Sequence, residues 1–154
     1  MTDSIHVDLP DEQATLALGA RLCGFSGLIF LQGELGAGKT TFVRGFLQGL
    51  GYQGAVKSPT YTLIEPYEIN GRRLLHLDIY RLGDAMELED IGVRDDLQQG
   101  NTLLVEWPER AQGKLGQPEL DIRLDYVDDA RQASIKATDS MLATRLVKVI
   151  SGNK

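Results

Sequence analysis

The amino-acid sequence predicts a three-layer α/β domain whose mixed sheet is parallel in the centre and antiparallel at its edges. Two short apolar runs, residues 27–32 (GLIFLQ) and 102–107 (TLLVEW), are typical of strands buried on both faces. Segments with a helical pattern follow the early strands, as expected where helices connect parallel strands. Two hairpin signals come later in the chain and indicate antiparallel pairs.

Each expected element rests on a local pattern. Residues 5–9 alternate in polarity, and Pro10 with Asp11 can open a helix, because proline fits a first turn and an acid suits the positive helix start. Asn70 and Gly71 form a strong hairpin signal. In order, the sequence predicts a strand over 5–9, a helix from 10 to about 24, a strand over 27–32, a helix over 39–50, a hairpin of 61–69 with 72–79, a short helix over 84–90, a strand over 102–107, a hairpin of 119–127 with 131–137 around Asp128-Asp129, and a helix over 140–150.

Length and composition favour one domain over residues 1–154, located in the cytoplasm. The chain has 154 residues, no internal repeat and one cysteine, Cys23, which excludes an internal disulfide. No apolar run approaches the roughly 20 residues of a membrane helix, and the N-terminal residues do not resemble a secretory signal. The net charge of −6 disfavours direct binding to DNA or RNA, so any link to RNA is expected to pass through a partner; on charge alone, the simpler interpretation is that the charge keeps the protein in solution.

A glycine-rich loop carries the strongest functional signal. Residues 33–40 read GELGAGKT and match the P-loop pattern G-x-x-x-x-G-K-[ST], with an apolar strand before them and a helix after them. Gly33, Gly36 and Gly38 allow the backbone N–H groups to curl around a phosphate. The following helix directs its positive end at the same anion. The alternative, a glycine turn with an exposed lysine, does not account for this context.

The side chains of the loop have distinct expected roles. Lys39 reaches the β- and γ-phosphates, the Thr40 hydroxyl binds Mg²⁺, and Thr41 supports the side of the α-phosphate. The predicted nucleotide-binding residues of the loop are Gly33, Leu35, Gly36, Ala37, Gly38, Lys39, Thr40 and Thr41.

Further candidates lie at the ends of later strands and in one loop. Asp78 ends the strand after the hairpin turn, where a second magnesium ligand belongs, although an ordinary strand-end aspartate fits too. Glu106 ends a buried strand and needs a partner there: a metal ion, an attacking water or an arginine at the rim of the sheet. Trp107 follows it and fits either the site or the core. Thr60 belongs to a hydroxyl-rich segment, which is either a nucleotide-sensing loop or a proline turn.

The absence of three motifs reduces the number of function classes that fit the sequence. The sequence lacks an N-K-x-D guanine-reading segment, which favours ATP over GTP, and lacks an arginine-rich lid of the kind that small-molecule kinases use. His6, His76 and Cys23 have no spacing typical of a zinc site.

With these residues placed, the chain resembles the bacterial TsaE family, the ATPase component of tRNA threonylcarbamoyladenosine biosynthesis. The matching stretches are GELGAGKTTF (33–42), KSPTYTL (57–63), HLDIYRL (76–82), the acidic segment 87–95 and VEWPE (105–109). They follow the family order, and both chain ends look similar to the family as well.

The resemblance implies a P-loop NTPase fold that binds ATP or ADP with Mg²⁺, and partner proteins TsaD and TsaB. By position in the family motifs, it implies catalytic roles for Lys39, Glu106, Asp78 and Thr60, metal contacts from Thr40, Asp78 and Glu106, and nucleotide contacts from Trp107 and Glu12.

The expected activity is a weak magnesium-dependent ATPase that partner proteins stimulate, acting as an accessory subunit of the tRNA-modifying complex. Two alternatives remain at this stage. One is a small-molecule P-loop kinase, and the other is a nucleotide-gated adaptor whose hydrolysis is incidental.

Overall fold

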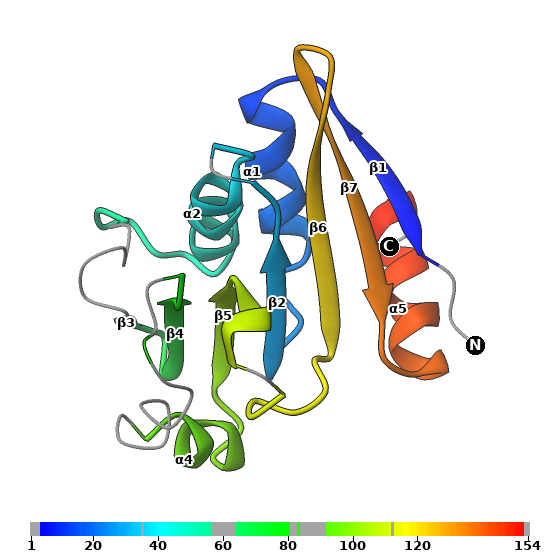
Figure 1. Ribbon diagram of the computed structural model, residues 1–154. Helices are drawn as coiled ribbons and strands as arrows, with labels where there is room; N and C mark the ends of the chain where they lie inside the picture. The colour runs from blue at the N-terminus through cyan, green and yellow to red at the C-terminus, as the bar shows by residue number, and fades with distance from the viewer. Residues whose placement is uncertain are drawn as a thin grey trace.

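The central sheet has seven strands in the order β1-β7-β6-β2-β5-β4-β3 (Figure 1). The computed structural model describes residues 4–34, 36–56, 64–80, 83, 92–111 and 113–152. The strands are β1 (Ile5–Leu9), β2 (Leu28–Gln32), β3 (Ile64–Ile69), β4 (Arg72–Asp78), β5 (Thr102–Glu106), β6 (Leu120–Val127) and β7 (Ala130–Ala137). Strands β6, β2, β5 and β4 run parallel, whereas β1–β7, β7–β6 and β4–β3 pair antiparallel. The predicted mixed α/β sheet with a parallel centre is confirmed.

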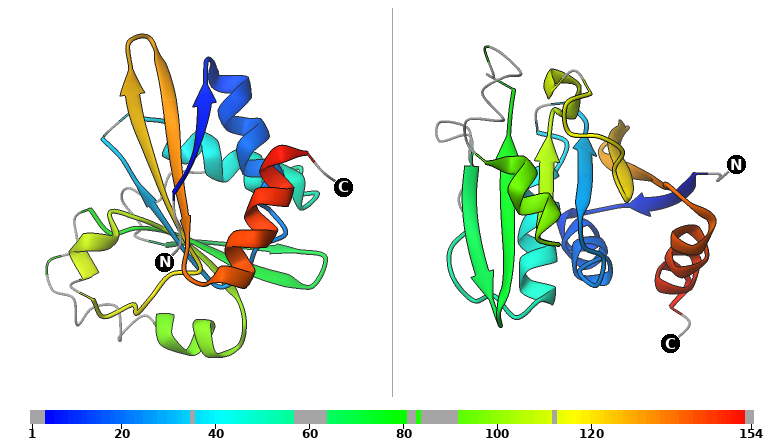
Figure 2. Two further views of the ribbon diagram at one scale, coloured as in Figure 1. Left: turned by 90° about the vertical axis from the view of Figure 1, so that its right-hand side faces the viewer. Right: turned by 90° about the horizontal axis from the view of Figure 1, so that it is seen from below.

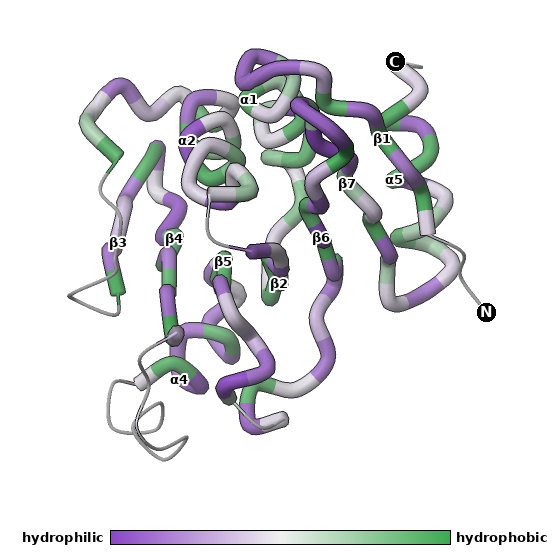
Figure 3. The backbone as a smooth tube through the Cα atoms, turned by 45° about the horizontal axis from the view of Figure 1, so that its top comes forward, coloured by the Kyte–Doolittle hydropathy of each residue, from purple (hydrophilic) through white to green (hydrophobic). Residues whose placement is uncertain are grey.

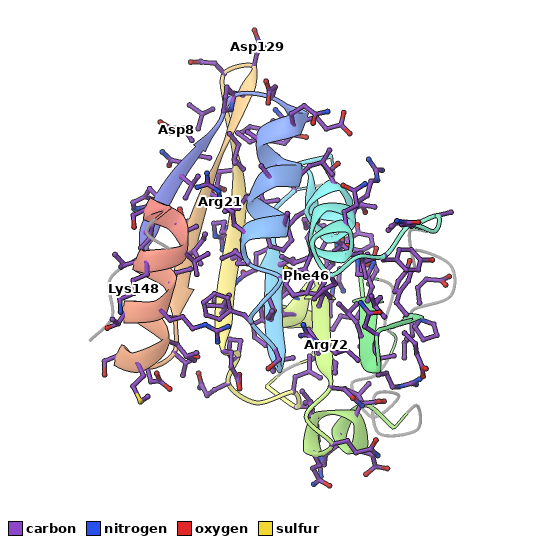
Figure 4. The ribbon with its side chains drawn as sticks, turned by 180° about the vertical axis from the view of Figure 1, so that it is seen from behind. Asp8, Arg21, Phe46, Arg72, Asp129 and Lys148 are labelled. Carbon is purple, nitrogen blue, oxygen red and sulfur yellow. The ribbon has the colours of Figure 1, made fainter. Side chains whose placement is uncertain are left out.

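Helices and apolar side chains cover the sheet in two clusters. The helices are α1 (Glu12–Arg21), α2 (Lys39–Gly49), α4 (Val93–Gln98) and α5 (Ser140–Ser151), with a 3₁₀ turn η1 (Pro108–Ala111). One cluster joins α1, α2 and α5 to the sheet, and Phe46 of α2 is fully buried in it (Figure 4). The other cluster lies on the opposite side, beneath α4 and η1 (Figure 2). Along β6, hydrophobic and hydrophilic residues alternate, so that one face of the strand packs inward (Figure 3).

Helices α1 and α2 pack closely because glycines line their contact. A Cβ atom at Gly45 would lie 2.1 Å from the carbonyl oxygen of Leu16, and one at Gly19 would lie 2.2 Å from that of Phe42. Neither position has room for a side chain. This contact fixes α2, and with it the loop that precedes α2, against the N-terminal helix.

The sequence-based elements agree closely with the observed ones. The Asn70-Gly71 turn joins β3 to β4 with φ angles of 52° and 82°, both positive, as a two-residue hairpin turn requires. The first helix is shorter than expected and ends at Arg21. Helix α4 was not predicted, and the expected helix over 84–90 lies outside the described residues. Within the described part of the chain, no helix is long and apolar enough to cross a membrane.

Candidate active site at the carboxyl ends of the parallel strands

The loop between β2 and α2 has the backbone that its glycines predict. Gly33, Gly36 and Gly38 have φ angles of 147°, 80° and 109°, a region that favours glycine. A Cβ atom at Gly33 would lie 2.6 Å from the carbonyl oxygen of Leu124 on β6, so this position excludes any side chain. Ala37 is fully buried, and Leu35 lies outside the described residues. The loop therefore presents mainly backbone at the N-terminus of α2, where an anion is favoured.

Lys39 is folded back onto this loop. Its Nζ donates a hydrogen bond to the carbonyl oxygen of Gly33 at 2.6 Å and lies 4.0 Å from the centre of the Trp107 ring. Only 5% of the residue is exposed, and this burial lowers the pKa of Lys39 from its usual range, while Glu106, Asp78 and Glu109 act in the opposite direction. A phosphate in the loop could replace the Gly33 carbonyl as the partner of this ammonium group.

Two carboxylates meet on the neighbouring strands. Asp78 and Glu106 are paired residues at the ends of the parallel strands β4 and β5, and Glu106 is also in register with Leu31 of β2. All three strands therefore end beside the loop. Burial raises the pKa of Asp78, the N–H of Tyr80 acts against it, and the charge of Glu106 adds to the rise. Such crowded carboxylates favour a cation between or beside them.

Glu106 has a buried partner that the sequence did not indicate. Its Oε2 lies 2.6 Å from Nε2 of His76, and the two residues are 4% and 0% exposed. The partner expected from sequence alone was a metal, a water or an arginine; in the described part of the chain it is a histidine. Sequence reasoning considered His76 only as a zinc ligand. The strand alternation that puts His76 on the same face of β4 as Asp78 was the available signal.

Trp107 adopts an unusual backbone conformation beside the loop. Its φ angle is 60°, which is uncommon for a bulky residue and recurs at functional sites. Its ring contacts the Lys39 ammonium group and lies 4.8 Å, centre to centre, from the ring of Tyr80. Trp107 therefore contacts Lys39 of the loop and also packs against the apolar cluster beneath α4 and η1.

A cavity of about 350 Å³ adjoins the other side of the loop. It lies between the β1–α1 connection, the glycine loop and the tip of the β6–β7 hairpin, where Asp129 is found (Figure 4). Thr41 and Glu12 line it. Glu12 also forms an exposed ion pair with Arg44 of α2 at 3.3 Å. The cavity has the size and position for the nucleoside part of a ligand whose phosphates occupy the loop.

The residues present fit a magnesium–phosphate site better than a metal site built from protein alone. Among the described residues, no group of three or more His, Cys, Asp or Glu side chains could hold a metal ion. Mg²⁺ typically takes one or two carboxylates together with water and substrate phosphates. Asp78, Glu106 and the half-buried Thr40 at the start of α2 offer that donor set. Thr60 lies outside the described residues.

Comparison with known proteins decides the family. Residues 9–134 match the family described as Threonylcarbamoyl adenosine biosynthesis protein TsaE. The chain belongs to the TsaE family. A relative from Haemophilus influenzae, named tRNA threonylcarbamoyladenosine biosynthesis protein TsaE, is 42% identical over 147 residues, which cover 90% of this chain and 93% of that protein. A relative of the same name from Bacillus subtilis is 38% identical over 130 residues, covering 83% and 81% of the two chains.

A solved structure shares the whole fold. The crystal structure of YdiB from Bacillus subtilis matches with a TM-score of 0.83 and 26% sequence identity, over 100% of this chain and 99% of that one. The resemblance inferred from the sequence motifs and the predicted α/β fold are both confirmed. The roles of the individual site residues remain predictions.

The position of Trp107 gives an optical test of the site. Because its ring contacts Lys39, a nucleotide that draws Lys39 toward its phosphates should change the surroundings of the ring. We expect the intrinsic fluorescence, which comes from the only tryptophan of the chain, to change in intensity or wavelength on titration with ADP or ATP. Free N-acetyltryptophanamide, titrated with the same nucleotide in parallel, controls for inner-filter effects. An unchanged spectrum at saturating nucleotide would contradict the contact between site and ring.

Proposed function

We propose that this member of the TsaE family binds ATP with Mg²⁺ and hydrolyses it slowly. The observation that carries the proposal is the meeting of the glycine loop and Lys39 with the paired strand ends at Asp78 and Glu106. A phosphate cradle beside two carboxylates is the arrangement that P-loop NTPases use.

In this proposal, each part of the site has a separate role. The backbone N–H groups of the loop and the N-terminus of α2 bind the phosphates, and Lys39 leaves Gly33 to contact them. Thr40 and Asp78 hold Mg²⁺, which when bound neutralises phosphate charge. Glu106 orients the attacking water or contacts the metal. The cavity beside Glu12 accepts the nucleoside.

We further propose that the ATPase serves the synthesis of threonylcarbamoyladenosine on tRNA. The relatives from Haemophilus influenzae and Bacillus subtilis carry that process in their names. The proposed partners are TsaD and TsaB, and the proposed location is the cytoplasm, where tRNA is modified. With a net charge of −6, the chain is a poor binder of tRNA by itself, so contact with tRNA passes through the complex.

The variant Lys39→Ala tests the central assignment. It removes the ammonium group while the backbone cradle remains, so ATP affinity should fall at least tenfold, or about 1.4 kcal/mol. Isothermal calorimetry with ATP and Mg²⁺ measures the change. Lys148→Ala, which removes an exposed lysine on α5, is the matched control and should bind ATP as the parent does. Equal affinity in the Lys39 variant and the parent would refute the phosphate-binding role of the loop.

A further inference from the structure

The pair formed by His76 and Glu106 is buried on the face of the sheet that α2 covers. Along β4, Leu75 and Leu77 belong to the apolar cluster on the opposite face, so His76 points to the α2 side together with Asp78. The register sets His76 opposite Leu104 and Asp78 opposite Glu106, so His76 is the diagonal neighbour of Glu106. His76 therefore lies one step behind Asp78 on β4, whereas the corresponding residue behind Glu106 on β5 is the apolar Leu104.

The imidazole ring of His76 has one hydrogen-bond partner among the described residues. Nε2 of His76 lies 2.6 Å from Oε2 of Glu106, and it is the donor of this hydrogen bond when the carboxylate is ionised, because an ionised carboxylate only accepts. The other ring nitrogen, Nδ1, is buried and has no hydrogen-bond partner among the described residues. Within that part of the chain, the side chain of His76 therefore makes its hydrogen bond to Glu106 alone. A buried polar ring is costly unless such a bond compensates it.

We infer that His76 is a positioning residue for Glu106, an inference that rests on the proposed ATPase function. By holding Oε2, the imidazole fixes the rotamer of the carboxylate and leaves Oε1 free for water or metal. A hydrogen bond that orients a working carboxylate is characteristic of metal and hydrolytic sites, and its removal typically costs 10- to 100-fold in activity. His76 itself touches no substrate in this arrangement.

Two substitutions with side chains of similar length distinguish a positioning role of His76 from a role in packing alone. His76→Gln places an amide N–H as many bonds from the backbone as Nε2, and His76→Met fills similar space without a donor. We expect His76→Met to lower kcat for ATP about 10- to 100-fold, with KM and the dissociation constant for ADP within about twofold of the parent. His76→Gln should recover most of the loss. Leu104→Val, which trims the residue opposite His76, controls for altered packing and should keep the parental kcat.

A second measurement does not depend on activity. In crystal structures of the variants, the Glu106 carboxylate should keep its parental rotamer in His76→Gln and leave it in His76→Met. An unmoved carboxylate in the methionine variant, a parental kcat in that variant, or a glutamine variant no better than the methionine one would each overturn the inference. A parent that neither binds nor hydrolyses ATP would instead refute the proposed function, while the crystal structures would still decide the role of His76.

Discussion

Replacing Glu106 with glutamine is expected to reduce the rate of ATP hydrolysis at least hundredfold. The substitution keeps the size of the side chain and removes the negative charge that would orient an attacking water or contact the metal. A positioned acid or base contributes about 10²–10⁴-fold to such reactions. Because Glu106 lies at a strand end and outside the phosphate loop, nucleotide binding in the absence of Mg²⁺ should stay within about twofold of the parent.

Steady-state phosphate release measures the effect, and calorimetry with ADP in the presence of a chelator checks that the phosphate cradle is intact. Glu68→Gln is the matched control, because Glu68 is an exposed carboxylate on β3, opposite Arg73 and at the end of the hairpin remote from Asp78. Hydrolysis at the parental rate in Glu106→Gln would show that Glu106 is a structural residue. If hydrolysis stops while partner regulation persists, the protein is a nucleotide-gated adaptor rather than a working ATPase.

The glycine loop and its backbone could be predicted from the sequence because the information that specifies them is contiguous. Eight consecutive residues, the strand before them and the helix after them specify the loop without knowledge of the rest of the fold. The positions of Asp78 and Glu106 at strand ends were predictable for a related reason, since local patterns reveal both strands. That Asp78 and Glu106 lie opposite each other could not be predicted locally, because it depends on the strand order. In the sheet, β4 lies beside β5, and β5 lies beside β2.

Features that depend on register or on distant segments were not predictable. The contact between His76 and Glu106 requires β4 and β5 to be aligned within one residue, and no local pattern sets that alignment. The left-handed backbone of Trp107 opposes the intrinsic preference of a bulky residue. The cavity beside the loop is lined by three segments that are far apart in the sequence, the β1–α1 connection, the loop itself and the β6–β7 hairpin.

The isolated protein is expected to be a poor ATPase that partner proteins activate. Fast hydrolysis needs extra positive charge on the γ-phosphate in the transition state, which an arginine often supplies. Several arginines near the site are already engaged within the chain. Arg44 pairs with Glu12 at 3.3 Å, Arg131 stacks on Tyr126 at 4.0 Å, and Arg110 lies 5.3 Å from the centre of the Tyr80 ring.

A cationic group supplied by a partner would complete the site. Such arginines act in trans in other P-loop proteins and raise rates by about 10³–10⁵-fold. Phosphate release should therefore rise at least tenfold when TsaD and TsaB are added, and the three proteins should associate more tightly with ATP than with ADP. Both effects follow if the partner surface contacts the γ-phosphate.

The measurement is steady-state phosphate release with and without the TsaD–TsaB pair, at matched protein concentrations. An Asp78→Ala variant, purified in the same way and assayed in place of the parent, tests for a contaminating ATPase. The variant should lose activity both alone and with the pair, whereas a contaminant would remain active. Rapid turnover by the isolated chain, unchanged by the pair, would show that the site at β2, β4 and β5 is complete without a partner. The contacts that Arg44, Arg110 and Arg131 make within the chain favour the opposite result, a site that binds its nucleotide but lacks one further positive charge for fast hydrolysis.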